Sequence, residues 1–354
     1  MKQFYPLSTF LTEYSEKNGG NTYRPVAIGR YGIRTRESIY SKELAKDYSK
    51  NKLIHKNTLT VGMGSVQIDI GVLTDDITYS VSPAYHTYKI AGVNAEYLRY
   101  CLECRNQDMF SRFVKRGSRQ GKTIDLKRWL TYEIPVYDEN RQQEIVDRLN
   151  QISELIEKRR EQLVQLSELV KSRFIELFGD PLKNDKDFPT ILGETLFKLS
   201  NGRALPNNKR FTVGIPAYGG NGISWYTDEI LCDYDTVIIG RVGFQSGNVH
   251  LAKAPLWVTD NAMYISWINN KEYDIRFLCS LMEHIDFKRY QDAGDLKKIT
   301  QKPFMQMYYL MPPLSLQKQY IAFVEQTDKS KLAVQKSLEE LEILKKSLMQ
   351  QYFG

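Results

Sequence analysis

Cysteine is scarce in this sequence, which has four Cys among 354 residues. Such a low count cannot support a disulfide framework and is typical of proteins kept in a reducing compartment. No apolar run reaches the roughly 18 residues that a membrane-spanning helix needs, and the start of the chain lacks the zones of a secretory signal peptide. We therefore expect a cytoplasmic protein without a membrane segment, long enough for two or three domains.

Metal-binding patterns are also lacking. The four histidines are scattered without paired spacing, at His55, His86, His250 and His284. Cys101 and Cys104 form a C-x-x-C pair, but a zinc site needs a second ligand pair, and the other two cysteines stand alone. We expect Cys101 and Cys104 to occupy two positions on one amphipathic helix, and we expect no metal site.

Catalytic motifs occur only as fragments. Residues 116–123 end like a phosphate-binding P-loop, yet Arg116 stands where the motif requires Gly, and the preceding segment is predicted to be helix rather than strand. Asp125-x-Lys127 and Asp295-x-Lys297 resemble the end of a nuclease motif but have no convincing acidic partner upstream. No Asn/Asp-Pro-Pro-Tyr/Phe tetrapeptide marks an adenine-methyltransferase centre. The sequence predicts a protein that is not an enzyme and holds no cofactor of its own.

Positive charge is concentrated in one part of the chain. The formal net charge is +7, but residues 1–131 alone carry 21 Lys and Arg against 12 Asp and Glu. Residues 132–180 carry 7 against 11, and the rest is nearly neutral. A basic domain suits a polyanion such as nucleic acid, although a solvated basic surface would give the same net charge.

The most informative feature that is present is an internal repeat. Residues 132–179 return as residues 309–354: both segments open with Tyr and Pro, turn helical and end in Phe-Gly, at a shift of 175. Weaker matches at shifts of 175–180 connect the regions before them. The repeat predicts an α+β fold of two similar mixed α/β domains, each followed by a long helix, with boundaries at 1–135, 136–180, 181–313 and 314–354.

The two long helices are predicted over residues 141–178 and from about residue 316 to residue 352. Apolar residues recur at steps of three and four, the heptad pattern of a coiled coil, with Arg159 and Arg173 filling gaps. Each helix would leave its stripe uncovered unless the two pack together, and the order of the domains favours an antiparallel pair. The stripe residues are Ile145, Leu149, Ile152, Ile156, Leu163, Leu166, Val170, Leu332, Leu338, Leu341, Leu344 and Leu348.

Within the domains the pattern predicts short strands and amphipathic helices. One helix is expected over Asn94–Phe113 and another over Tyr273–Tyr290. Polar, Gly-rich loops, such as residues 240–247, are where recognition residues tend to sit, although any single loop could be a plain connection. Strands are expected at Leu59–Val61, Thr78–Ser82, Thr236–Ile239 and Ala262–Trp267.

These features resemble the specificity subunit of type I restriction–modification systems. The helical repeats carry the resemblance most strongly: Ile134-Pro135 precedes Gln142-Gln143-Glu144-Ile145, and Met311-Pro312-Pro313-Leu314 precedes Gln317-Lys318-Gln319-Tyr320-Ile321. The family usually has Glu-Gln at this helix start. Here Gln143 and Gln319 hold the Gln, while Gln142 and Lys318 replace the Glu. Residues 239–247, 257–262 and 81–85 are also similar to family signatures.

The resemblance implies two target-recognition domains, each reading half of a split site in double-stranded DNA. It implies that the paired helices act as a spacer and as a docking surface for two methyltransferase subunits, which bind S-adenosylmethionine and methylate adenine at N6. Restriction subunits that use ATP and Mg²⁺ are implied as further partners. At about 1.5 Å per residue, the first helix is long enough to place two heads one or more DNA turns, about 34–36 Å, apart.

Candidate DNA contacts are basic and amide side chains, because Arg and Gln offer bidentate groups to guanine and adenine while Lys suits phosphates. Arg119, Gln120, Arg241 and Gln245 rank first because they lie in Gly-flanked loops. The full set is Arg34, Arg36, Arg116, Arg119, Gln120, Lys122, Lys209, Arg210, Arg241, Gln245, Lys297 and Lys298.

The alternative interpretation is a non-catalytic coiled-coil scaffold that presents two protein-binding modules. Strong salt dependence of DNA binding would favour the DNA reader, and absence of DNA affinity would favour the scaffold. A restriction enzyme of another type would need a fused methylase or nuclease domain, for which 354 residues leave no room.

Overall fold

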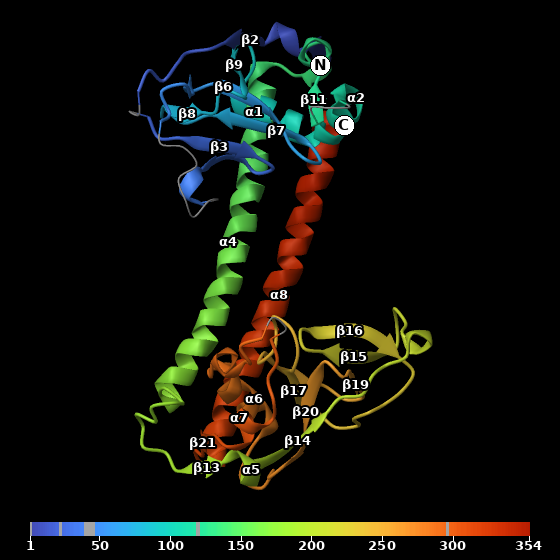
Figure 1. Ribbon diagram of the computed structural model, residues 1–354. Coiled ribbons are helices and arrows are strands. Elements are labelled where there is room, and N and C mark those ends of the chain that lie inside the picture. Colours follow the sequence, from blue (N-terminus) through green and yellow to red (C-terminus); the bar gives the residue numbers. More distant parts are fainter. Residues whose placement is uncertain (1, 21–22, 39–46, 118–120, 295–296) are drawn as a thin grey trace. The chain divides into compact units, whose positions relative to one another are not determined.

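The computed structural model describes residues 2–20, 23–38, 47–117, 121–294 and 297–354, with the backbone alone at Glu37 and Arg116. The chain forms two compact units. Unit 1 consists of Met1–Arg160 together with Gln335–Gly354, and unit 2 consists of Glu161–Val334. Each unit contains one mixed α/β domain and one end of each long helix (Figure 1).

Unit 1 is built on a four-stranded antiparallel sheet with the strand order β2-β9-β6-β7. Its inner strand β6 (Thr58–Met63) is buried almost throughout, as its run of Leu, Thr and Val residues predicts. Helices α1 (Ala95–Cys104) and α2 (Asn106–Phe113) pack against the sheet at β7. The other strands are β2 (Leu11–Tyr14), β7 (Ile68–Leu73) and β9 (His86–Ile90).

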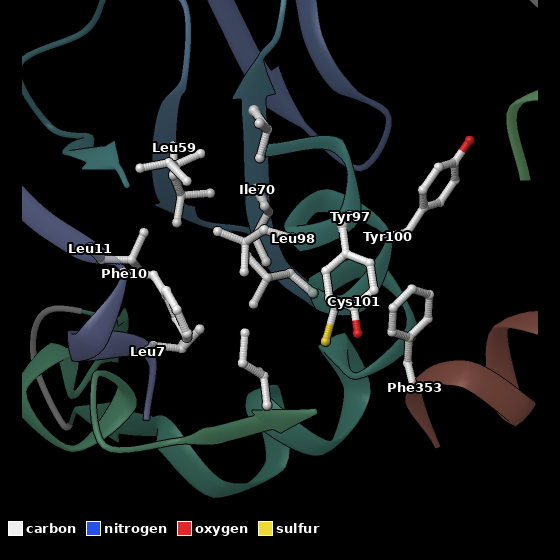
Figure 2. Packing of buried hydrophobic residues seen from close by; sticks show 14 of the residues in the cluster. Leu7, Phe10, Leu11, Leu59, Ile70, Tyr97, Leu98, Tyr100, Cys101 and Phe353 are labelled. Carbon is white, nitrogen blue, oxygen red and sulfur yellow. The ribbon is translucent and has the colours of Figure 1, made fainter. Parts of the chain in front are cut away.

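The core of unit 1 joins this sheet to α1 (Figure 2). Leu59 and Ile70 from the sheet, and Tyr97 and Leu98 from α1, are all buried. The last turn of the chain belongs to the same core, because the Phe353 ring packs edge-on against the Tyr97 ring with 5.1 Å between centroids. The C-terminal Phe-Gly of the repeat is therefore a packing element of unit 1.

Among the described residues, four two-stranded antiparallel sheets complete unit 1. They are β1 (Gln3–Pro6) with β12 (Glu133–Val136), β3 (Val26–Gly29) with β4 (Gly32–Thr35), β5 (Lys52–Ile54) with β8 (Tyr79–Val81), and β10 (Val114–Gly117) with β11 (Gly121–Ile124). The short helix α3 (Leu126–Trp129) follows β11. Because β1 pairs with β12, the N-terminal strand lies beside the segment that leads into the first long helix.

Unit 2 repeats this plan. Its four-stranded sheet has the order β14-β20-β17-β18, and α6 (Ile275–Glu283) packs against β17 and β18. Asn94 caps α1 and Asp274 caps α6 at the predicted shift of 180, and each side chain accepts a hydrogen bond from a backbone N–H of its helix. The sheet strands are β14 (Phe197–Asn201), β17 (Thr236–Gly240), β18 (Val249–Ala252) and β20 (Ala262–Ile268).

The smaller elements of unit 2 also have counterparts in unit 1. Strand β15 pairs antiparallel with β16 and parallel with β19, and β13 pairs with β21 as β1 pairs with β12. Their bounds are Thr190–Leu192 for β13, Ile215–Gly219 for β15, Gly222–Thr227 for β16, Trp257–Val258 for β19, Tyr308–Leu310 for β21, Gly193–Leu196 for α5 and Lys302–Met305 for α7. The predicted pair of similar mixed α/β domains is confirmed.

The two long helices are α4 (Glu139–Phe178) and α8 (Leu314–Phe353), and they pair antiparallel. In unit 1 the first half of α4 meets the end of α8, where the Arg148 guanidinium donates to the Tyr352 hydroxyl at 3.2 Å. In unit 2 the end of α4 meets the start of α8, where the Phe174 and Tyr320 rings lie 5.5 Å apart. Among the described residues no helix, these two included, is long and apolar enough to cross a membrane.

The buried stripe of each long helix follows heptad steps. On α4, Ile145, Leu149, Ile152 and Ile156 are buried, and Leu163, Leu166 and Val170 are half-buried. On α8 the inward positions are Gln317, Ile321, Val324, Thr327, Lys331, Val334, Leu338, Leu341, Lys345 and Leu348.

Two residues predicted for the α8 stripe do not lie on it. Leu332 is 73% exposed and Leu344 is 47% exposed, so their assignment to the stripe is wrong. The heptad register places the neighbouring Lys331 and Lys345 inward instead. A lysine stem covers apolar surface with its methylene groups while the ammonium stays near water. Burial nevertheless lowers the pKa of Lys345.

Three short elements also differ from prediction. The helix expected over Asn94–Phe113 is two helices that meet at Arg105, and the helix expected over Tyr273–Tyr290 ends at Glu283. It ends there because Asp286 caps a separate 3-10 turn, accepting a hydrogen bond from the Lys288 N–H. The helix expected before Arg116 ends at Phe113, and Val114 and Lys115 belong to strand β10, which pairs with β11.

A buried glutamine ties each long helix to its domain. The Gln142 side-chain oxygen accepts from the Asn94 N–H at 2.9 Å, and its amide donates to the Tyr137 carbonyl at 2.7 Å. In unit 2 the Gln317 oxygen accepts from the Asp274 N–H at 2.9 Å, and its amide donates to the Pro312 carbonyl at 2.9 Å. Both glutamines bond the residue that caps the domain helix.

These contacts correct the assignment of the glutamine at the helix start. The structure equates Gln142 with Gln317, at the repeat's shift of 175, rather than Gln143 with Gln319. Gln143 is exposed, and its amide donates to the Asp147 carboxylate one turn along the helix. Both adjacent glutamines contact Asn94, because the Gln143 oxygen accepts from the Asn94 side-chain amide at 3.1 Å. Only Gln142 is buried.

We expect Gln142→Leu to lower the free energy of unfolding by about 1–3 kcal/mol, because it leaves the Asn94 N–H and the Tyr137 carbonyl without their partner. Urea denaturation of the full chain measures this loss. Gln143→Leu is the matched control and is expected to change stability by no more than about 0.5 kcal/mol. Equal losses in the two variants would contradict the structural role of Gln142.

Candidate nucleic-acid interface

In both units three segments meet beside the central sheet. They are the turn of a hairpin, the loop that joins the inner strand to the outer strand, and the segment that precedes a short helix. We call these places loop edge 1 and loop edge 2, because loops held by a rigid sheet are where binding residues concentrate. Loop edge 1 comprises residues 29–32, 64–67 and 121–122, and loop edge 2 comprises residues 219–222, 241–248 and 297–299.

Two side-chain hydrogen bonds connect the segments of loop edge 1. The Gln67 amide donates to the Arg30 carbonyl oxygen at 3.4 Å, and the Lys122 ammonium donates to the Ser65 carbonyl oxygen. The same ammonium lies 5.3 Å from the centroid of the Phe110 ring. Lys122 is half-buried, so its position is defined while its partners in the protein are neutral.

An exposed tyrosine flanked by arginines stands at the hairpin turn of loop edge 1. Tyr31 is 73% exposed, and the guanidinium groups of Arg30 and Arg34 lie 5.7 and 5.9 Å from its ring centroid. A guanidinium is always charged near neutral pH and offers five donors in a planar fork. The turn therefore presents two cations and one aromatic face to the solvent.

The other predicted contacts of unit 1 differ in their surroundings. The Arg36 guanidinium packs over the Tyr48 ring at 5.2 Å, and the residue is half-buried. Arg116 pairs with Lys122 across the β10–β11 hairpin by backbone register. Arg119 and Gln120 lie outside the described residues.

A nearby aspartate compensates the positive charge of Lys115. The Lys115 ammonium donates to the Asp125 carboxylate at 2.7 Å, and this contact lowers the pKa of Asp125. The carboxylate is therefore ionised at neutral pH and compensates the charge of Lys115. Lys122 donates to a carbonyl oxygen instead, so its charge is available to an anionic partner.

Close backbone packing shapes loop edge 2. A Cβ at Gly240 would lie 2.4 Å from the Gln245 carbonyl oxygen and 2.9 Å from that of Gly220, so only glycine permits this approach of the β15–β16 turn to the β17–β18 loop. The third segment is attached by the backbone. The Gly243 N–H donates to the Lys297 carbonyl at 2.8 Å, and the Ile299 N–H donates to the Arg241 carbonyl at 3.0 Å.

Loop edge 2 brings together four of the residues predicted to contact DNA. Lys297 and Lys298 are exposed, and Lys298 forms a bridge with Val242. Arg241 is half-buried, and its guanidinium donates to the Asp260 carbonyl oxygen at 3.4 Å. Gln245 accepts a hydrogen bond from the Asn248 side-chain amide, which orients its own amide group.

Lys209 and Arg210 belong to a different cluster of unit 2. The Lys209 ammonium lies 3.6 Å from the Asp228 carboxylate and 3.5 Å from the Glu229 carboxylate. The Arg210 guanidinium lies 5.1 Å from the Trp225 ring centroid and donates to the Leu205 carbonyl oxygen at 2.9 Å. The charge of Lys209 is thus largely compensated within the protein.

Several residues beside the loop edges were not among the DNA contacts predicted from the sequence. Phe244 is 81% exposed, and the Lys288 ammonium lies 5.3 Å from its ring centroid. Arg30 and Tyr31 form the two-residue turn between Gly29 and Gly32, and that glycine spacing was the available signal. No sequence signal places Lys288 beside Phe244.

The described residues of these loops form no metal centre. Over the described part of the chain, no group of three or more His, Cys, Asp or Glu residues is placed to hold a metal ion. The arrangement offers cations, amides and aromatic rings on two equivalent loop clusters. These are the groups that contact phosphates and base edges in protein–DNA complexes.

A comparison with protein families gives a match that spans most of the chain in two parts. The family described as the type I restriction modification DNA specificity domain matches residues 8–166 and again residues 192–343. The two matched segments correspond to the two copies of the internal repeat. No curated protein gives a significant match.

The solved structures similar to this chain in fold include the following two. The S subunit of a type I restriction–modification system from M. genitalium is 17% identical, with a TM-score of 0.65, and the alignment covers 100% of this chain and 96% of that one. A chain from a study of complex assembly and conformational transition of the type I R-M system is 13% identical, with a TM-score of 0.54, covering 99% and 97%.

Proposed function

This chain belongs to the type I restriction–modification DNA specificity family, and we propose that it reads a split target in double-stranded DNA, one half with each domain. The observation that carries the proposal is the recurrence, in both family domains, of the same loop edge with basic and aromatic side chains. The family is defined by DNA specificity and not by a catalytic centre. Methylation and cleavage would then belong to partner subunits.

The side chains of the loop edges support a division of labour. Lys122, Lys297 and Lys298 would contact phosphates, which fixes the position of each domain on the duplex without reading sequence. Arg and Gln side chains can make bidentate hydrogen bonds to guanine and adenine in the major groove. We therefore assign base reading to Arg30 and Arg34 in unit 1 and to Arg241 and Gln245 in unit 2. Arg119 and Gln120 stay predictions from the sequence.

The long helices would set the gap between the two half-sites and dock the partners. We assign them two methyltransferase subunits, which bind S-adenosylmethionine and methylate adenine at N6, and restriction subunits that use ATP and Mg²⁺. Leu332 and Leu344 suit docking better than helix pairing, because they are exposed apolar residues on α8.

We expect Arg241→Ala to weaken binding of the cognate duplex by about 1–3 kcal/mol and to relax one base position of the target, because one bidentate contact is lost. Binding to duplexes with each base substituted in turn measures both effects. Lys298→Ala is the control from the same loop edge. It should weaken all duplexes evenly and reduce the salt dependence of binding by about one phosphate contact.

The two variants separate base reading from phosphate contact. If Arg241→Ala weakens every duplex equally, Arg241 contacts the backbone and the assignment of base reading is wrong. If it changes neither affinity nor target, Arg241 does not touch the DNA. In the absence of DNA, the hydrogen bond from Arg241 to the Asp260 carbonyl is long, at 3.4 Å. The Arg241 side chain can therefore reorient toward DNA at a small cost in free energy.

A further inference from the structure

Each unit carries an exposed apolar side chain at the same place in its fold. Phe244, in the β17–β18 loop, is 81% exposed, and Val66, in the corresponding β6–β7 loop, is 61% exposed. A single exposed apolar residue needs no explanation by itself. Here the same position is apolar and exposed in both copies, and it lies on the loop edge that we assign to DNA.

The loop that carries Phe244 is held firmly. The Ser246 N–H donates to the Gly243 carbonyl at 3.0 Å, and the Gly247 N–H donates to the Gly240 carbonyl at 2.8 Å. Gly243, directly before Phe244, has φ +86°, which glycine adopts readily. Because these hydrogen bonds fix the backbone of the loop, the Phe244 side chain cannot turn into the core and remains exposed.

One cation lies against the Phe244 ring, and the segment bonded to its loop carries two more. The Lys288 ammonium lies 5.3 Å from its centroid, a cation–π distance. Lys297 and Lys298 are exposed on the segment whose backbone bonds Gly243. A partner that covers this place must accept an apolar ring at its centre and positive charge around it. Duplex DNA does so, because stacked bases lie between rows of phosphates.

We propose that Phe244 is a wedge that inserts between base pairs in the half-site read by unit 2. Apolar side chains inserted at base steps unstack the bases and bend the duplex. This deformation costs less free energy at flexible base steps than at stiff ones, so the protein binds flexible steps more tightly. Lys288 would leave the ring and contact a phosphate when the ring enters the stack. Val66 is too small to fill an opened step and would contact base edges, such as the thymine methyl group, without unstacking. This inference rests on the proposed function.

The test uses the full chain assembled with its modification subunits and a duplex that carries its methylated motif. The adenine analogue 2-aminopurine is placed at successive positions of the unit 2 half-site other than the methylated adenine, which a methyltransferase itself takes out of the stack, because its fluorescence rises when stacking is lost. We expect a rise at one step with the wild-type chain, and no rise with Phe244→Ala. We also expect Phe244→Ala to bind about 10–100-fold more weakly, as loss of one aromatic–base stack implies.

Three controls complete the design. Phe244→Leu should restore part of the fluorescence rise, because leucine can also wedge a base step open. Tyr308→Ala removes another exposed aromatic ring of unit 2, 63% exposed on β21, and should change neither readout. Val66→Ala should leave the unit 2 signal as it is. Thermal unfolding establishes that Phe244→Ala remains folded.

The outcomes are distinguishable. If the wild-type chain binds and directs methylation but no step brightens, the wedge is wrong while DNA reading stands. If Phe244→Ala keeps its DNA affinity and loses a modification subunit, the ring docks a protein and the wedge is again wrong. If the wild-type chain neither binds DNA nor directs methylation, the proposed function fails and the wedge fails with it.

Discussion

Inserting one heptad into each long helix is expected to widen the gap between the two half-sites by about three base pairs. Seven residues add about 10.5 Å at about 1.5 Å per residue, and one base pair spans about 3.4 Å. The insertions belong between Arg160 and Glu161 in α4 and between Val334 and Gln335 in α8, at the two points where the chain passes from one compact unit to the other. Seven residues preserve the heptad register of both stripes. Mapping N6-methyladenine in cells that carry the lengthened chain reads the new gap directly.

A second insertion serves as the control. Two residues in each helix turn everything beyond the insertion by about 200°, so both apolar stripes are rotated out of the helix interface. We expect that variant to lose directed methylation rather than to shift the gap. If the seven-residue insertion leaves the gap unchanged while methylation continues, the helices do not measure the distance between the half-sites.

Exchange of residues 181–313 for the corresponding domain of another family member is expected to replace one half of the methylated motif and leave the other half and the gap as they were. The physical reason is that unit 2 has its own hydrophobic core, which extends from the sheet to α6 and the adjoining ends of α4 and α8. Loop edge 2 is bonded entirely within that unit, through pairs such as Gly243 with Lys297. Methylome mapping of the hybrid gives the new motif.

The reciprocal exchange of residues 1–135 is the matched control and should replace the other half. Each exchanged domain must keep the glutamine contact that joins it to its long helix. That contact is between Gln142 and the N–H of residue 94 in unit 1, and between Gln317 and the N–H of residue 274 in unit 2. A hybrid that alters both half-sites at once would contradict independent reading. A hybrid that alters neither would remove unit 2 from DNA recognition.

The large elements of the fold could be predicted from the sequence because their signals are long and periodic. The helices α4 and α8 end within a few residues of the predicted bounds, and the shift of 180 between Asn94 and Asp274 is reproduced by the two helix caps. Prediction failed where the hydrophobicity of a residue and its position in the packed structure point to different environments. Leu332 looks like a stripe residue by hydrophobicity, yet the heptad register turns Lys331 inward and leaves Leu332 73% exposed.

The loop edges could be predicted only in part. Arg241 and Gln245 follow from a Gly-rich loop, which is a local feature of the sequence. The approach of Lys297 to Gly243 and of Lys288 to Phe244 depends on packing between segments more than forty residues apart. Burial also decides between adjacent residues of one type, as Gln142 and Gln143 show. Neither kind of information is present in the spacing of residues along the chain.

The most direct test of the central claim is a genome-wide map of N6-methyladenine in cells that carry this chain with its modification subunit, compared with cells that lack only this chain. We expect one split motif, with a fixed number of unspecified bases between its halves, that is present in the first map and absent from the second. Identical maps would mean that the chain does not direct a methyltransferase. In that case the two domains would be better understood as protein-binding modules on a coiled-coil scaffold.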